Sequence, residues 1–169
     1  QQFAAARIPV NGPGPRRLAD SVTGRTLLGA LGLPDARWRR DRVIEVIGGG
    51  PLRFGDDHVR PAAWDELSRE AGVVIDLADW RRKIEYDADR TEVRIADLDA
   101  DDVNDSAAYQ LRRLRDRLVD GRNLVAFVEQ LHQQVQAVEQ ATTWPEKCAA
   151  TRALLHDLLG TEDQHSWWP

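Results

Sequence analysis

The sequence contains no methionine, one cysteine and only two lysines among its 169 residues. The single Cys148 excludes an internal disulfide and suits a reducing cytoplasm. Because no methionine opens the chain, we expect a processed chain or a piece of a longer one. No apolar run approaches the roughly 18 residues of a membrane span, and the first residues lack the charged and apolar regions of a signal peptide. These absences predict a soluble, cytoplasmic protein with no membrane partner.

The charge balance is acidic, with 28 acidic and 23 basic residues and a net charge of −5. This balance excludes a DNA clamp whose whole surface is basic, although it permits a local basic patch. A chain of this length fits one domain, which buries roughly 70% of the surface that the unfolded chain exposes. We therefore interpret residues 1–169 as a single domain.

Apolar residues recur at helical spacing along most of the chain, which predicts a mainly α, irregular helical domain. About seven helices are expected, at residues 18–31, 35–47, 61–71, 77–94, 106–119, 124–140 and 143–159. Pro61 suits a first helical position, and Gly72 suits the position just after a helix ends. The only strand signal is a small hairpin around Gly55. Residues 95–104 are predicted to form an acidic, solvated loop, and residues 120–123 to break the helical pattern.

The aromatic residues and the cysteine fall mostly on predicted core stripes. Trp64, Trp80 and Trp144 are expected in the core, and Cys148 is expected as a small buried hydrophobic residue of the last helix. The pair Trp167 and Trp168 differs, because it lies in a polar segment beyond that helix. We interpret these two residues as docking residues for a neighbouring domain.

Motifs for catalysis or cofactor binding are missing. Gly24-Arg-Thr26 imitates the end of a phosphate-binding P-loop, but its first glycine is replaced by Ala19 and its lysine by arginine. No Asp/Glu-x-Lys triplet occurs, which excludes a PD-(D/E)xK nuclease site. The aspartates of residues 97–105 lack the central glycine and the closing glutamate of a calcium loop. The four histidines have no zinc-ligand spacing. We expect no catalytic, cofactor or metal residues in this chain.

Arginine runs are the remaining positive signal. Guanidinium groups bind phosphate oxygens in pairs of hydrogen bonds, and about half of protein–DNA hydrogen bonds go to the backbone. Interspersed carboxylates also favour a second interpretation, in which the arginines form salt bridges on helix surfaces. The candidate DNA-contact residues are Arg16, Arg17, Arg39, Arg40 and Arg42.

Several segments in order carry a family resemblance: Ile8-Pro-Val-Asn-Gly, residues 17–33, Arg40-Asp-Arg-Val, residues 64–74 with Trp80, and Trp144-Pro-Glu. This order is similar to UvrD/Rep superfamily 1 DNA helicases, and in particular to AddB- or RecB-like helicase-nucleases of high-GC actinobacteria. The likeness spans residues 3–159 and depends on packing and turn residues. The acidic residues 97–105 depart from the pattern.

The resemblance implies that the chain is the helical insertion of the second RecA-like motor domain. ATP and Mg²⁺ would then bind elsewhere in the parent helicase, and the partners would be DNA and the remaining domains of that parent. The expected function is a non-catalytic accessory region in DNA repair or recombination. The alternative is a structural or protein-protein interaction domain that contacts no nucleic acid.

Overall fold

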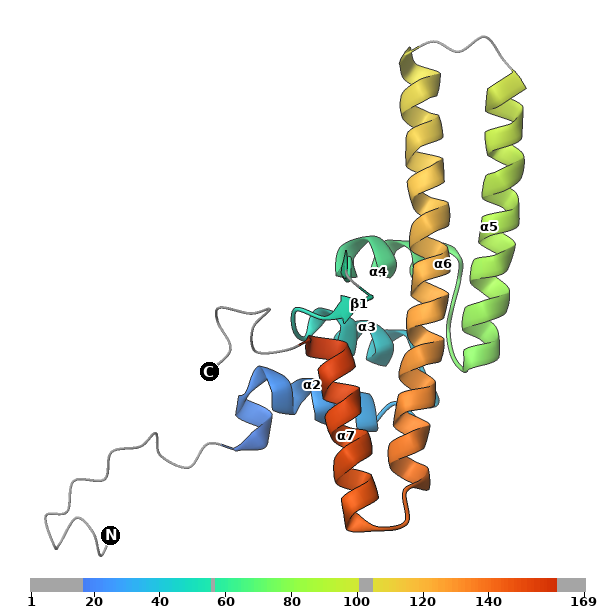
Figure 1. Ribbon diagram of the computed structural model, residues 1–169. Helices are drawn as coiled ribbons and strands as arrows, with labels where there is room; N and C mark the ends of the chain where they lie inside the picture. Colours follow the sequence, from blue (N-terminus) through green and yellow to red (C-terminus); the bar gives the residue numbers. More distant parts are fainter. Residues whose placement is uncertain (1–16, 56, 101–104, 161–169) are drawn as a thin grey trace, which may run out of the picture.

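The computed structural model describes residues 17–55, 57–100 and 105–160, and its fold is mainly α (Figure 1). The described elements are a 3-10 turn η1 (Leu18–Asp20), α2 (Val22–Leu31), α3 (Arg40–Gly48), β1 (Arg53–Phe54), β2 (Asp57–His58), α4 (Pro61–Glu70), α5 (Leu77–Ala100), α6 (Asp105–Gln140) and α7 (Trp144–Leu159). The two short strands pair antiparallel, as the sequence predicted for a hairpin around Gly55. The mainly α prediction is confirmed.

A compact body forms where α2, α3, α4, β1 and α7 pack around the second half of α6 (Figure 1). Aromatic rings meet at its centre: the ring of Phe127 lies 5.3 Å from that of Trp64 and 5.9 Å from that of Phe54. Trp80 is 1% exposed, and its indole N–H donates to the backbone carbonyl of Trp38 at 2.8 Å. Two of the three tryptophans predicted in the core, Trp64 and Trp80, are therefore confirmed there.

The segment from Pro61 to Gly72 forms the predicted helix and stop. Pro61 occupies the first turn of α4, and Gly72 follows the helix with a φ of 76°, a conformation that favours glycine. Trp64 and Leu67 are each 3% exposed, so this short helix turns its apolar side into the core. Sequence and structure agree closely here because local turn chemistry and apolar spacing specify the same helix.

The helix expected at residues 35–47 is α3, which begins at Arg40 and not at Asp35. Residues 32–38 form turns, in which Arg37 and Trp38 have φ values of 50° and 54°. Distant backbone groups hold this segment: the amide of Arg40 donates to the carbonyl of Val74, and the amide of Asp76 donates to that of Arg37. Tertiary hydrogen bonds thus replace the first turn that the local sequence suggested.

The expected break at residues 120–123 is wrong, because α6 is continuous through them. Gly121 lies where α6 packs against Ile84 of α5 and Leu67 of α4. A Cβ atom at this position would stand 3.3 Å from Ile84 Cγ2 and 3.7 Å from Leu67 Cδ1. The glycine therefore permits a close helix crossing and does not end the helix.

The acidic segment is also more helical than expected. α5 extends to Ala100, six residues beyond the predicted end at Arg94, so six of the ten residues of the predicted loop are helical. Residues 101–104 lie outside the described residues. Carboxylates do not end α5 because its inner face stays apolar: Ile95 and Leu98 remain partly buried along the side that faces α6.

The last helix begins with a capping box, and two of its residues that were expected in the core are exposed. Thr143 Oγ1 accepts from the amide of Glu146, and the Glu146 side chain accepts from the amide of Thr143, which makes a capping box. Trp144 is 79% exposed and Cys148 is exposed, so neither lies in the core as expected. The buried face carries Leu154, Leu158 and Leu159. Thr151 and Leu155 on the same face are partly buried, whereas residues 144–149 are all exposed, so only the second half of α7 packs on the body.

Candidate interaction surfaces

The candidate DNA-contact arginines on α3 are held by carboxylates. Arg39 donates two hydrogen bonds to Asp41 at 3.0 and 3.1 Å. Arg40 pairs with Asp65 of α4 at 2.5 Å, and Arg42 pairs with Glu45 at 2.7 Å. The hydrogen bond with Glu45 raises the pKa of Arg42. These three arginines lie together, but each already has an anionic partner.

The other candidate residues lie toward the two ends of the sequence. Arg17 is exposed just before η1, where its amide donates to the Asp20 carboxylate at 3.2 Å. Arg16, Trp167 and Trp168 lie outside the described residues. The structure thus brings Arg39, Arg40 and Arg42 to one helix end and adds no contact between them and Arg17.

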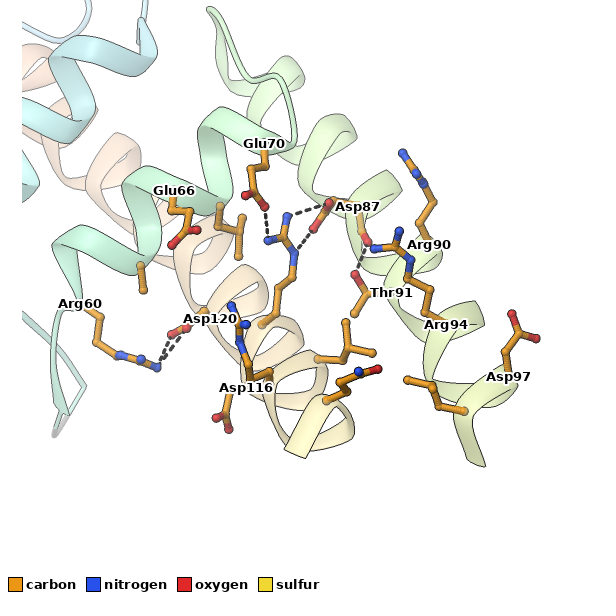
Figure 2. A pocket seen from close by; sticks show the side chains of 17 residues that line it. Arg60, Glu66, Glu70, Asp87, Arg90, Thr91, Arg94, Asp97, Asp116 and Asp120 are labelled. Atoms are coloured by element: carbon orange, nitrogen blue, oxygen red, sulfur yellow. Dashed lines mark hydrogen bonds and ion pairs between the residues drawn. The ribbon is translucent and has the colours of Figure 1, made fainter. Parts of the chain in front are cut away.

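A cleft of about 820 Å³ opens between α4, α5 and α6 (Figure 2). Arg117 of α6 lines this cleft and bridges two helices, with paired 2.9 Å hydrogen bonds to Asp87 of α5 and an ion pair to Glu70 of α4. The hydrogen bonds with Asp87, followed by those with Glu70, raise the pKa of Arg117. This network fixes the angle between α4 and the long α5–α6 hairpin.

A second ion pair closes the other side of the cleft, where Arg60 meets Asp120 (Figure 2). Asp120 is only 8% exposed, and Arg60 Nη1 lies 3.0 and 3.1 Å from its two carboxylate oxygens. Burial raises the pKa of Asp120, and the charge of Arg60 acts in the opposite direction. The carboxylate is therefore partly buried at the point where α6 leaves the body.

The chemistry of the cleft is ionic. No histidine, lysine, serine or cysteine stands among its lining residues, and the hydroxyl of Thr91 donates to the carbonyl of Asp87 at 2.8 Å. Across residues 17–55, 57–100 and 105–160, no cluster of three histidine, cysteine, aspartate or glutamate residues is suited to hold a metal ion. The arrangement supports salt-bridge formation and contact with charged groups.

A second exposed surface belongs to the arm, which we define as residues 85–100 of α5 and 105–122 of α6. Its outer part extends past α4, with no other described element beside it (Figure 1). Tyr86, Val93 and Tyr109 are each more than half exposed on the arm. Within the described part of the chain, Arg94, Arg112 and Arg113 form no ion pair.

Sequence reasoning did not identify the arm or the cleft. The cleft depends on tertiary placement, since α4, α5 and α6 supply its walls from distant parts of the chain. The sequence did predict helices along the arm. The predicted break at Gly121 and the predicted loop from residue 95 divided this one long hairpin into shorter pieces. None of the described helices has the length and apolarity needed to cross a membrane.

Comparison of the chain with protein-family models, with curated proteins and with solved structures gives no match.

Proposed function

We propose that this chain is a non-catalytic helical interaction module, in which the body is a scaffold and the arm contacts another protein. The observation that carries the proposal is the contrast between the two parts. The body buries a continuous core, whereas the arm extends past it with exposed Tyr86, Val93 and Tyr109. Aromatic side chains at such exposure supply contact area with little loss of conformational entropy on binding.

The ion pairs at the base of the arm support this proposal. Arg117 connects α4, α5 and α6, and Arg60 connects the loop before α4 to α6. An arm held at a fixed angle is preorganised, and preorganisation lowers the entropic cost of binding. If the helicase resemblance holds, the natural partner would be a motor domain of the same parent chain.

Site-specific photo-crosslinking in cells tests this proposal. A photo-reactive residue in place of Tyr86 is expected to give a discrete protein adduct, identified by mass spectrometry. The same residue in place of Leu28, which is 49% exposed on α2 of the body, is the matched control and should give no discrete adduct. Adducts to nucleic acid from the arm, or equal adducts from both positions, would contradict the proposal.

A second candidate is duplex DNA contact within a DNA helicase, and the unpaired arginines of the arm favour it. Arg94, Arg112 and Arg113 are exposed without an ion pair to a described residue, whereas Arg39, Arg40 and Arg42 are already paired with carboxylates. Phosphate contact by arginines that have no carboxylate partner breaks no existing salt bridge. This candidate therefore places DNA on the arm rather than on α3.

A salt-titrated binding assay on a forked duplex separates the two candidates. DNA contact predicts a Kd better than about 0.1 mM at low salt and a steep loss of affinity as salt rises. Changing Arg94, Arg112 and Arg113 to alanine should then weaken binding, whereas the matched triple variant at Arg39, Arg40 and Arg42 should weaken it less. A Kd weaker than about 0.1 mM at low salt excludes this second candidate.

A further inference from the structure

The two helices of the arm carry opposite charge. Residues 85–100 of α5 contain six carboxylates and two arginines, and residues 105–122 of α6 contain five arginines and three aspartates. The cleft side of the arm faces α4 at its base, with Arg90 and Arg94 on α5 and Arg113 on α6. The opposite side, which we call the back face, has a different arrangement of charge.

The back face consists of one acidic and one basic stripe. Glu85, Asp89 and Glu92 recur at i, i+4 and i+7 on α5, and all three are exposed. Arg112, Val119 and Arg122 recur at i, i+7 and i+10 on α6, also exposed. The ion pair from Arg122 to Glu92, at 3.2 Å, crosses between the two helices and places both stripes on one face.

Contacts within the hairpin also fix which residues lie at the same height. Arg117 pairs with Asp87 and Gly121 lies against Ile84, so residues 84–87 of α5 lie beside residues 117–121 of the antiparallel α6. The guanidinium of Arg122 reaches along the hairpin to Glu92. A two-fold axis that runs parallel to the arm keeps each residue at the same height along the arm in both copies. It places α5 of one copy against α6 of the other, whereas an axis across the arm places α5 against α5.

We infer that the back face of the arm docks a second copy of this chain, with the acidic stripe of each copy against the basic stripe of the other. This inference builds on the proposed function by naming a partner for the arm. Charge complementarity selects the axis parallel to the arm, because the other axis brings like charges together. Asp89 of one copy then faces the partner's Val119 and the guanidinium of the partner's Arg122, which extends to the level of Glu92. α4 lies on the opposite side of the arm and does not obstruct the contact.

The size of the face predicts a weak dimer. Sixteen helical residues span about 24 Å at 1.5 Å per residue, and two adjacent helices are about 20 Å wide. Each copy therefore offers about 500 Å², which gives a total near the lower limit for specific interfaces. Exposed charges dominate the face, so association is expected to depend on both protein concentration and salt.

Sedimentation velocity of the full chain at rising concentration tests this inference. At low ionic strength, we expect a monomer–dimer equilibrium that shifts to monomer at high salt. The Asp89→Arg substitution should weaken dimerisation at least tenfold, because it places an arginine opposite Arg122 of the partner. Adding Arg122→Glu to Asp89→Arg should restore much of the dimer by exchanging the two charges.

Asp97→Arg is the matched control, because Asp97 is an exposed α5 aspartate that lines the cleft side and its reversal changes the net charge equally. It should leave dimerisation unchanged, and circular dichroism verifies that each variant is folded. A chain that stays monomeric up to about 300 µM, well above the micromolar Kd of weak specific complexes, overturns the inference. So does equal weakening by Asp89→Arg and Asp97→Arg. Either result leaves the protein-contact proposal standing, since the crosslinking experiment tests that proposal separately.

Discussion

The two halves of α6 have the same backbone and very different surroundings. In the second half, Leu124, Phe127, Val128, Leu131 and Val135 are each at most 2% exposed and belong to the body core. Among residues 106–119, Leu111 is the buried apolar residue, and it lies outside the main core cluster. One continuous helix thus serves as a core element at one end and as an exposed arm at the other.

The difference teaches what stabilises each half. Helices in proteins derive most of their stability from packing of an apolar face. The second half of α6 packs against several elements of the body. The first half packs mainly against α5 and is held by a network of ion pairs. We expect substitutions in the second half to affect folding and substitutions in the first half to affect contacts with other molecules.

The largest effect is expected for Phe127→Ala. Phe127 is 2% exposed and contacts the rings of Trp64 and Phe54, so its truncation removes apolar burial and leaves a cavity at the centre of the body. The free energy of unfolding should fall by about 3–5 kcal/mol. Denaturant unfolding followed by tryptophan fluorescence measures the change. A loss below about 1 kcal/mol would place Phe127 outside the core and break the comparison.

The sharpest test of the comparison uses one substitution at two places in α6. Leu124→Ala should cost about 3 kcal/mol, because Leu124 is fully buried in the body. Leu114→Ala should cost about 1 kcal/mol, because Leu114 is half-buried between the arm helices. The same unfolding experiment measures both. Equal costs would mean that the arm is packed as tightly as the body.

The sequence predicted the body better than the arm, for a physical reason. α4 has a proline start, a glycine stop and an apolar stripe that agree with one another, so local signals were sufficient. The arm has weak apolar spacing and many charges, and charges do not distinguish a solvated helix from a loop. The helix break predicted around Gly121 was wrong because a glycine at a helix crossing and a glycine at a helix end look the same in the local sequence.

The last helix shows a different limit. The apolar spacing continues from Trp144 to Leu159, and only tertiary packing decides that the second half of α7, with Leu154, Leu158 and Leu159, is buried while the first half is exposed. The cleft was also beyond prediction, since Arg60, Glu70, Asp87 and Arg117 meet there from distant positions. The arginine runs predicted surface ion pairs as one of two interpretations, and the α3 arginines do form them.

An intermediate effect is expected at the boundary between the two halves, where Arg60 pairs with Asp120. Arg60→Ala should cost about 1–3 kcal/mol at neutral pH, because the buried carboxylate loses its cation. Burial already raises the pKa of Asp120, so its carboxyl group keeps its proton to a higher pH in the folded protein than in the unfolded chain. This group therefore favours folding most at low pH, and that contribution is lost as pH rises through the raised pKa.

Unfolding experiments at pH 7 and about pH 3 test the direction of this pH dependence, since the lower pH lies below the ordinary aspartate pKa. The cost of Arg60→Ala should be larger at pH 7 and nearly absent at the lower pH. Asp120→Asn, which has the same shape without the charge, is the control. In that background Arg60→Ala should cost little at either pH. The same cost at both values in the wild-type background would exclude Asp120 as the group concerned.

The smallest effect is expected for the ion pair between Glu92 and Arg122 on the back face. Its side chains are 53% and 70% exposed, and such pairs contribute about 0.2–1 kcal/mol. The pair between Asp87 and Arg117, with side chains 21% and 25% exposed and two hydrogen bonds, should contribute about 2 kcal/mol. Double-mutant cycles to alanine, measured by unfolding at protein concentrations too low for self-association, give both coupling energies. A small coupling for Glu92 and Arg122 means that these charges are not needed to keep the hairpin closed and stay available to a second copy. The reverse order would assign the back-face charges to the stability of the arm itself and remove the physical basis for pairing between copies.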